Sequence, residues 1–189
     1  DVTASSGIVI HSGLITVGAT TGDLDNDGDP EIILTTREGS SALLYENLGD
    51  GTYRNITLAA GLNLTENGQE DLAQSFSVSL GDVNLDGLLD IYVTSWIDSA
   101  IYLFDSTGAL EGFAHTCSPD KLFINQGNLQ FEEMAESYGV KNMGCGLASV
   151  FTDYDQDGDM DIMVANDFGA WSEPDKLYRN EFPLPQFTD

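Results

Sequence analysis

A short acidic pattern occurs three times in the chain and constrains its fold more than any other sequence feature. Each copy begins with Asp, places Asp or Asn at the third position and Asp at the fifth, Gly at the sixth, and an acidic residue at the ninth. The copies begin at Asp23, Asp82 and Asp153. Self-similarity on this scale is typical of proteins built from repeated units that pack side by side. We therefore expect three copies of one structural unit.

The segments around the acidic loops repeat as well. A short β-type stretch precedes each loop, a stronger one follows it, and a third stretch ends in Asn. In chain order these stretches are 16–21, 32–35 and 43–47; 76–80, 91–94 and 121–125; and 147–152, 162–165 and 176–180, with a fourth stretch at 52–56 and 130–134 in the first two units. Four short antiparallel strands per unit describe one blade of a β-propeller. The sequence predicts an all-β fold of propeller-type blades, with about three blades present in a partial or intermolecularly completed propeller.

The repeats divide the chain into segments. Residues 1–12 are expected to be the end strand of a preceding or neighbouring blade, residues 13–66 the first repeat, residues 67–141 the second repeat with an insertion at 98–120, and residues 142–189 an incomplete third repeat. On this division the units are cut in phase. Either the chain is part of a longer propeller, or a neighbouring molecule completes the open blade by strand addition. A β-sandwich would have strands at similar spacing, but it gives no reason for one acidic turn in every unit.

The spacing of the acidic residues predicts metal sites. Alternate side chains of a tightly coiled loop converge on one point, Gly permits the sharp turn, and the seventh residue adds its backbone carbonyl. Hard oxygen ligands in this number suit Ca²⁺ better than Mg²⁺. We expect up to three Ca²⁺ ions, with weaker binding in the second loop. The expected ligand positions are Asp23, Asp25, Asp27, Asp29 and Glu31; Asp82, Asn84, Asp86, Leu88 and Asp90; and Asp153, Asp155, Asp157, Asp159 and Asp161.

Two other interpretations of the acidic loops are less favoured. An EF-hand requires a bidentate Glu at the twelfth position, where this chain has Leu34, Val93 and Val164. Acidic surface turns without an ion would leave five carboxylates within nine residues in the first and third loops. Like charges at that density raise each other's pKa or require a cation. The ninth-position acid therefore closes a compact loop that leads directly into a strand.

The charge of the chain excludes several classes of function. Its 32 acidic residues against 6 Lys and Arg give a net charge of -26, which repels nucleic acids and anionic lipid surfaces. The apolar content of 41% is that of a folded chain, and no apolar run is long enough to span a bilayer. With two histidines and neither a Gly-x-Ser-x-Gly nor a His-Glu-x-x-His motif, the sequence predicts no enzyme.

The acidic loop leading into a β-strand, followed by Leu-Tyr/Phe-x-Asn, resembles the FG-GAP and VCBS repeats of integrin-alpha-like β-propellers. Residues 120–140 and 1–8 are similar to segments of the subgroup related to cartilage acidic protein. The resemblance implies a calcium ion in the loop between the first two strands of each blade. It also implies an extracellular or cell-surface protein that serves adhesion or recognition.

Two further expectations depend on that location. Asn55 and Asn63 begin N-glycosylation sequons, which an exported protein is able to use. Cys117 and Cys145 are either two thiols or one disulfide bond, and the extracellular resemblance favours the bond.

The function predicted from the sequence is a secreted, calcium-binding, non-enzymatic module that recognises a protein or glycan. One alternative is a self-assembling extracellular filament or surface-layer subunit, in which copies of the chain join head to tail by strand complementation. Another is an accessory module of a secreted enzyme.

Overall fold

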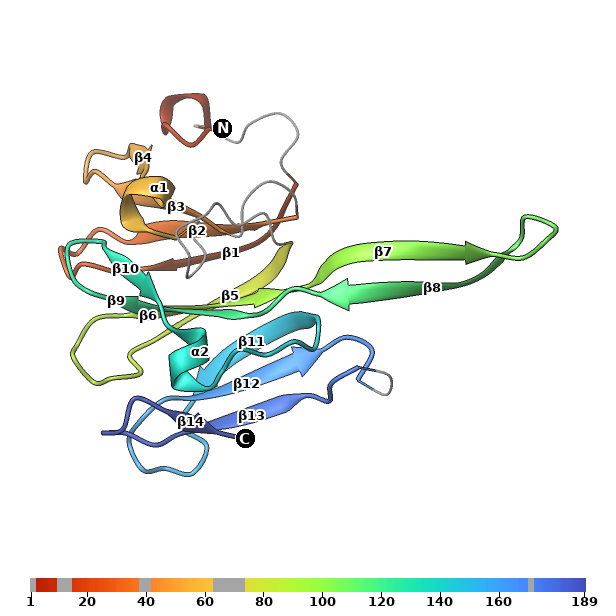
Figure 1. Cartoon of the computed structure of the whole chain (residues 1–189). Helices are drawn as coiled ribbons and strands as arrows, with labels where there is room; N and C mark the ends of the chain where they lie inside the picture. The colour runs from red at the N-terminus through yellow and green to blue at the C-terminus, as the bar shows by residue number, and fades with distance from the viewer. Residues whose placement is uncertain (1–2, 10–14, 38–41, 63–73, 170–171) are drawn as a thin grey trace.

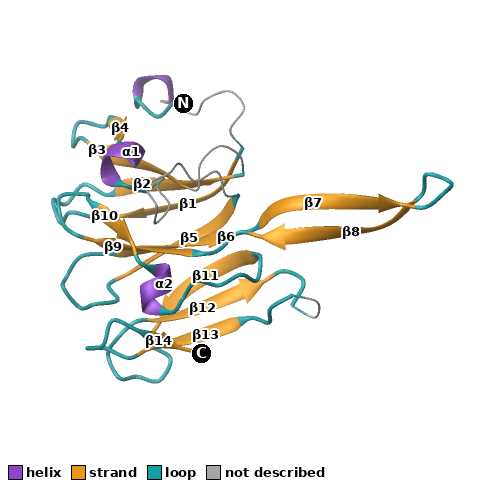
Figure 2. Cartoon of the chain, in the orientation of Figure 1, coloured by secondary structure: helices purple, strands orange, loops and turns teal. Residues whose placement is uncertain are grey.

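The computed structural model describes residues 3–9, 15–37, 42–62, 74–169 and 172–189 (Figure 1). Over these ranges the chain forms fourteen strands, two single-turn α-helices and one 3-10 helix (Figure 2). Twelve of the strands make three antiparallel sheets of four strands, and the other two make a separate hairpin. The all-β fold with four-stranded, propeller-type blades is confirmed.

The three sheets are the three blades, and each has the same strand order. Blade 1 contains β1 (Thr16–Gly22), β2 (Glu31–Thr36), β3 (Ala42–Asn47) and β4 (Tyr53–Asn55); blade 2 contains β5 (Ser75–Gly81), β6 (Asp90–Ser95), β9 (Lys121–Asn125) and β10 (Phe131–Glu133); and blade 3 contains β11 (Gly146–Thr152), β12 (Asp161–Asn166), β13 (Lys176–Asn180) and β14 (Phe187–Thr188). Each acidic loop joins the first two strands of its blade. The fourth strand of blade 3 is only two residues long.

The helices follow the fourth strands. The single turns α1 (Thr57–Ala60) and α2 (Ala135–Tyr138) come directly after β4 and β10, and each ends at a glycine in the left-handed conformation. At the N-terminus, where the sequence predicts an end strand, Thr3–Ser5 form a 3-10 helix and residues 6–9 have no regular structure. This segment lies against blade 1, because the Ser6 carbonyl accepts a hydrogen bond from the Tyr53 amide at 2.7 Å.

The hydrophobic core lies between the blades. Successive residues of a strand point to opposite faces of a sheet. Blade 2, which lies between the other two blades, can therefore pack on one neighbour with each face. Ile33 and Leu44 of blade 1 share one buried cluster with Phe123 of blade 2. Tyr92 and Leu122, on the other face of blade 2, share the second cluster with residues of blade 3. The first strands β1, β5 and β11 lie next to one another, with β5 in the middle (Figure 1).

One face of blade 3 is partly exposed, whereas the corresponding faces of blades 1 and 2 are buried. The second residue of the acidic loop is fully or almost fully buried in blades 1 and 2, as Leu24 and Val83, whereas Tyr154 in blade 3 is 46% exposed. Leu177 occupies the β13 position that matches Leu44 and Leu122, and it is 39% exposed where those two are fully buried. Blade 2 covers these apolar positions on blade 1, and blade 3 covers them on blade 2, whereas on blade 3 itself they remain partly exposed.

Strands β7 (Ile97–Phe104) and β8 (Leu110–Cys117) form a long hairpin between β6 and β9. This hairpin, called the arm below, projects away from the three blades (Figure 1). It accounts for most of the insertion that the sequence indicates at residues 98–120.

At each junction a strand-ending asparagine is among the side chains that connect neighbouring blades by hydrogen bonds. Asn125 ends β9, and its amide nitrogen donates to the Leu24 carbonyl of blade 1 at 2.8 Å and to the Leu89 carbonyl at 3.1 Å. Asn180 ends β13 and donates in the same way to Val83 of blade 2 at 2.8 Å. Because these carbonyls are withdrawn from water, each Asn satisfies an acceptor in the neighbouring blade that would otherwise remain unpaired.

We expect Asn125→Ala to destabilise the protein much more than Asn47→Ala. Asn125 is buried and bonds across the blade junction, so its loss leaves buried carbonyls unpaired and costs about 2–4 kcal/mol of unfolding free energy. Asn47 holds the matching place in blade 1, but it is partly exposed and its amide bonds only within its own blade, to Pro30 and Tyr53. Its replacement should cost about 1 kcal/mol. Urea denaturation measures both; equal losses would contradict the junction role.

Candidate metal centre

All three acidic loops share one pair of internal hydrogen bonds. The first Asp accepts two backbone amides of its own loop, so its two oxygens hold the loop coiled. In loop one, the Asp23 carboxylate accepts the amides of Asp27 and Gly28, both at 3.0 Å. Asp82 and Asp153 accept the amides at the matching positions at 2.8–3.2 Å. The loops are therefore one structure formed three times.

The backbone of each loop turns through the left-handed region twice, at the fourth and sixth positions. The sixth position is Gly28, Gly87 or Gly158, with φ between 88° and 101°. No atom lies within 4 Å of where a Cβ would stand at these glycines, so conformation and not crowding requires glycine.

The ninth-position acid ties the loop to the third strand. Asp90 is fully buried, and its carboxylate accepts the Val83 amide of the loop at 2.9 Å and the Asn125 amide of β9 at 2.8 Å. Asp161 makes the equivalent bonds at 3.0 Å and 2.8 Å, and Glu31 makes them at 2.9 Å and 3.4 Å. The strand-ending Asn of each blade is thus bound at its backbone by this carboxylate.

The structure brings three of the five predicted ligand residues together in each of the first and third loops. Carboxylate oxygens of Asp23, Asp25 and Asp27 lie within 4.8 Å of one another, and so do those of Asp153, Asp155 and Asp161. In the second loop the Asn84 amide nitrogen donates to the Asp86 carboxylate at 2.9 Å. That hydrogen bond occupies one carboxylate oxygen of Asp86 within the loop.

One carboxylate oxygen in the third loop fits a cation in particular. Asp159 is buried, and among the described residues its Oδ1 atom has no hydrogen-bond partner. Leaving a buried carboxylate oxygen unpaired is costly unless the group binds a proton or a cation. The loop spacing predicts only a backbone carbonyl ligand from this seventh residue, whereas in the structure its side-chain oxygen is also available to an ion.

Burial raises the pKa of several loop carboxyls. Desolvation is the largest cause in each case. For Asp25, Asp155 and Asp159, repulsion from neighbouring carboxylates raises the pKa further. For Glu31 and Asp90, backbone hydrogen bonds to the carboxylate lower the pKa and partly offset desolvation. The pKa of Asp90 is raised to about 7 and that of Asp159 to about 6. Without a cation, some of these loops hold protons near neutral pH.

A further buried carboxyl lies outside the loops. Asp120 accepts the Ser95 amide at 2.7 Å, the Asn142 side-chain amide at 2.8 Å and the Tyr92 hydroxyl at 3.2 Å. Desolvation raises its pKa to about 7. Neither this group nor the side-chain bonds of Asn125 and Asn180 follow from the acidic pattern, although the Asn at the end of each third stretch is visible in the sequence.

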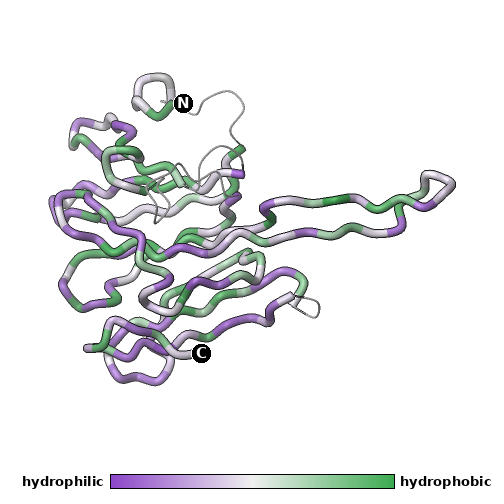
Figure 3. Tube along the Cα trace, viewed as in Figure 1, coloured by the Kyte–Doolittle hydropathy of each residue, from purple (hydrophilic) through white to green (hydrophobic). Residues whose placement is uncertain are grey.

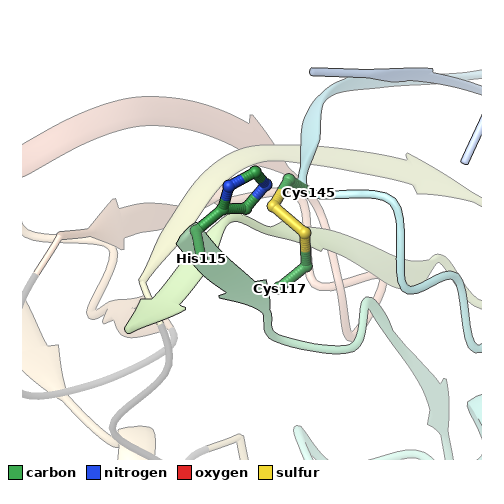
Figure 4. A group of neighbouring side chains, drawn as sticks. All are labelled: His115, Cys117 and Cys145. Atoms are coloured by element: carbon green, nitrogen blue, oxygen red, sulfur yellow. A yellow bond between two sulfur atoms is a disulfide. The ribbon is translucent and has the colours of Figure 1, made fainter. Parts of the chain in front are cut away.

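A second type of metal site is ruled out by covalent chemistry. His115, Cys117 and Cys145 lie close together, but the two sulfur atoms form a disulfide bond (Figure 4). Disulfide sulfur does not provide the thiolate that a metal would require. The bond joins the end of β8 to the residue that precedes β11, so it fixes the base of the arm to blade 3. Such a bond is compatible with an extracellular protein.

The glycosylation positions differ in what the structure describes. Asn55 ends β4 with an exposed side chain whose oxygen accepts the Thr57 amide at 3.1 Å. The Thr57 hydroxyl of the same sequon is buried and accepts the Leu44 amide at 2.9 Å. Asn63 lies outside the described residues. None of the helices described here is long and apolar enough to cross a membrane.

Comparison with known proteins supports the repeat family for part of the chain. Residues 23–93 match the family profile of the FG-GAP-like repeat, a stretch that includes the first two acidic loops. No curated protein matches the chain. The match does not distinguish between subgroups of the repeat.

Three solved structures are similar at low identity. They are a Bacillus licheniformis rhamnogalacturonan lyase PL11 at 16% identity, the exotype rhamnogalacturonan lyase YesX at 14% and the rhamnogalacturonan lyase YesW at 14%. The alignments cover 80%, 81% and 88% of this chain and 40%, 39% and 42% of those chains, each with a TM-score of 0.30. The chain thus spans about two fifths of their length. A likeness at this TM-score carries no argument about activity.

We expect Asp120→Asn to flatten part of the pH dependence of stability in metal-free buffer. The pKa of Asp120 in the folded protein is about 7, against 3.8 for an ordinary Asp, so the folded state holds the proton more tightly than the unfolded chain. This group's contribution is therefore full at low pH and is lost as pH rises through 7. From pH 5 to pH 8 the wild type should lose about 3 kcal/mol more than the variant.

Urea denaturation in EGTA at the two pH values measures this difference. Taking the difference between wild type and variant cancels the contribution of the loop carboxyls, which both proteins share. The same pH dependence in both proteins would contradict the assignment.

Proposed function

We propose that this chain is a calcium-stabilised, non-enzymatic recognition module of the β-propeller type that acts outside the cell and binds a protein or a glycan. The observation that carries the proposal is the repeated loop. Loops one and three each collect three carboxylates around one point. Loop three also contains the buried Oδ1 atom of Asp159, which has no hydrogen-bond partner among the described residues.

The loops fit a hard divalent cation. Asp23, Asp25 and Asp27 would hold the ion in loop one. Asp153, Asp155 and Asp161, together with Asp159, would hold it in loop three. Flexible sets of carboxylate and carbonyl oxygens favour Ca²⁺ over Mg²⁺. The ion supplies the positive charge that these loops lack, and its role here is structural because each loop connects the two strands of a hairpin.

Extracellular recognition is supported by observations outside the loops. The disulfide bond between Cys117 and Cys145 suits an oxidising compartment. His115 packs its ring on Phe168 with centroids 4.4 Å apart, and the two sulfur atoms beside it are joined in the disulfide bond, so neither is a thiol nucleophile. A binding role therefore has more support than catalysis, including the alternative of a module attached to a secreted enzyme.

The filament alternative has less support in the form that depends on strand complementation. All three described sheets contain four strands, so the edge strand that a neighbour would supply is present in each blade. The net charge of -26 on every copy also opposes close association of the chain with itself.

We expect chelation of Ca²⁺ to lower the melting temperature strongly. An ion at a hundredfold its dissociation constant stabilises the folded state by about 2.7 kcal/mol per site. Two occupied sites would contribute about 5 kcal/mol, which corresponds to a shift of more than about 10 °C for a chain of this size. Thermal unfolding in Ca²⁺ and in excess EGTA measures the shift. Identical melting curves would overturn the proposal.

A substitution in one loop distinguishes the contribution of the ion to stability from that of the fold without the ion. Asp155→Asn should remove about half of the Ca²⁺-dependent shift, since one of two strong sites is lost. In EGTA the same variant should be at least as stable as the wild type, because repulsion within the cluster is relieved. Glu132→Gln removes an exposed charge outside the loops and should leave the shift unchanged.

We also expect Ca²⁺ binding to release protons below neutral pH. The ion binds ionised carboxylates, whereas the pKa of Asp159 in loop three is about 6 without it. The apparent affinity of this site should therefore fall as pH drops from 7.5 to 5.5, by up to about tenfold per pH unit for each proton released. Calorimetric titration in two buffers of different ionisation enthalpy counts the protons. An affinity independent of pH over this range would contradict the assigned pKa of Asp159.

A further inference from the structure

The arm carries large apolar side chains that the rest of the described chain leaves at least 45% exposed. Large exposed residues occupy consecutive positions of β7 and continue on β8: Ile101, Tyr102, Leu103, Phe104, Leu110 and Phe113. Tyr102 and Phe104 are 61% and 62% exposed. A two-stranded ribbon has no core of its own, so these residues do not stabilise the arm by burial. Contiguous apolar surface of this kind marks an interaction site.

Both faces of the arm are apolar. The strand register places Tyr102 opposite Phe113 and Phe104 opposite Leu110 on one face. Ile101, opposite Ala114, lies on the other face because neighbouring residues of a strand alternate. An ordinary surface hairpin would show polar residues on its solvent face. The ribbon therefore suits a partner that meets both faces at once.

The edges of the arm are unpaired along its length. Within the described part of the chain, β7 and β8 pair only with each other. An edge strand presents a row of backbone donors and acceptors to which another extended segment can pair. A segment added at this edge alternates its own side chains between the two faces, and so reaches both apolar surfaces.

The base of the arm is held in place, which favours binding without reorganisation. The disulfide bond fixes Cys117 to Cys145. The Trp96 indole donates to the Asp167 carboxylate at 3.2 Å, and the rings of Phe113 and His115 both pack on Phe168 of the blade 3 side. Figure 1 shows the arm extended beyond the blades, so a partner reaches it without meeting the rest of the molecule.

Charge determines which partner fits. Residues 97–117 contain Asp98, Asp105 and Glu111 but no Lys or Arg. The whole chain has a net charge of -26, and three Ca²⁺ would reduce it only to -20. Such a charge repels a second copy of the chain and anionic lipid surfaces, and it attracts cationic segments.

We propose that the arm binds a basic polypeptide segment in extended conformation, which adds to the arm as a third strand and places apolar and Lys or Arg side chains along it. This inference rests on the proposed recognition function and names the binding surface and the class of partner. Its test below does not involve the loops, so a failure of calcium stabilisation and a failure of the arm can be told apart.

The test uses a synthetic ten-residue peptide of alternating Val and Lys with blocked ends, titrated at physiological salt and followed by calorimetry. We expect saturable one-to-one binding. A peptide of alternating Ser and Lys tests charge alone, and one of alternating Val and Glu tests apolar character alone. Both should bind at least tenfold more weakly. N-methylation of every residue of the Val-Lys peptide removes all of its backbone donors, on both edges, and should abolish binding.

Variants locate the site. Tyr102→Ser/Phe104→Ser/Leu110→Ser should weaken binding of the Val-Lys peptide at least tenfold. The matched control Leu58→Ser/Val150→Ser/Leu177→Ser removes three exposed apolar side chains from the blades and should bind as the wild type does. Melting curves in the same buffer establish that both variants are folded.

Four results would overturn the proposal. These are the absence of binding by the wild type, equal binding by the arm variant and the wild type, equal binding of the Ser-Lys or N-methylated peptide, and a concentration-dependent dimer that the arm substitutions abolish. The last result would identify a second copy of the chain as the occupant. Equal binding by the arm variant would mean that the acidic surface as a whole attracts the peptide.

Discussion

The ninth-position carboxylate of each acidic loop is the interaction on which the arrangement of the blades depends. In blade 2, Asp90 accepts one amide from its own loop and one from the strand-ending Asn125, so it fixes the end of the third strand against the start of the second. The side chain of that Asn then reaches the loop of the preceding blade. A single buried carboxylate thereby links the conformation of a loop, the register of a sheet and the packing of two sheets.

This arrangement buries carboxylates in the protein interior, where an unpaired charge costs the most free energy. Asp90, Asp161 and Glu31 are buried beside further carboxylates, and within the described ranges backbone amides compensate them but no Lys or Arg does. Amides stabilise a carboxylate without neutralising it. The remaining charge is balanced by a proton at lower pH, as the raised pKa of Asp90 indicates, and in the proposed function by a cation at higher pH. The fold and the proposed ion sites therefore depend on the same group of carboxylates.

Much of the fold could be predicted from the sequence because its determinants are local. The alternating apolar stretches and the Asp-x-Asp/Asn-x-Asp-Gly loops specify hairpins, and a hairpin repeated three times specifies blades. The side-chain bonds of Asn125 and Asn180 could not be predicted, since their acceptors lie about a hundred residues earlier in the chain. The burial of Asp120 could not be predicted either, because only the packing of blades 2 and 3 withdraws it from water. Whether the loops hold Ca²⁺ stays a prediction, as does the division of the chain into repeats.

The arm could be recognised in the sequence only as an interruption of the repeat. Its residues violate the pattern that identifies the other strands, since Ile101 to Phe104 are apolar at every position instead of every second one. In a blade, four such residues would be buried on both faces, as they are in β6. In the arm no neighbouring sheet covers them, and Figure 3 shows hydrophobic (green) stretches on the arm as well as on the strands of the blades. A sequence typical of a buried strand on an exposed hairpin is the signature of a surface that another molecule covers. The same logic applies more weakly to Tyr154 and Leu177, because on blade 3 the apolar positions alternate with polar ones.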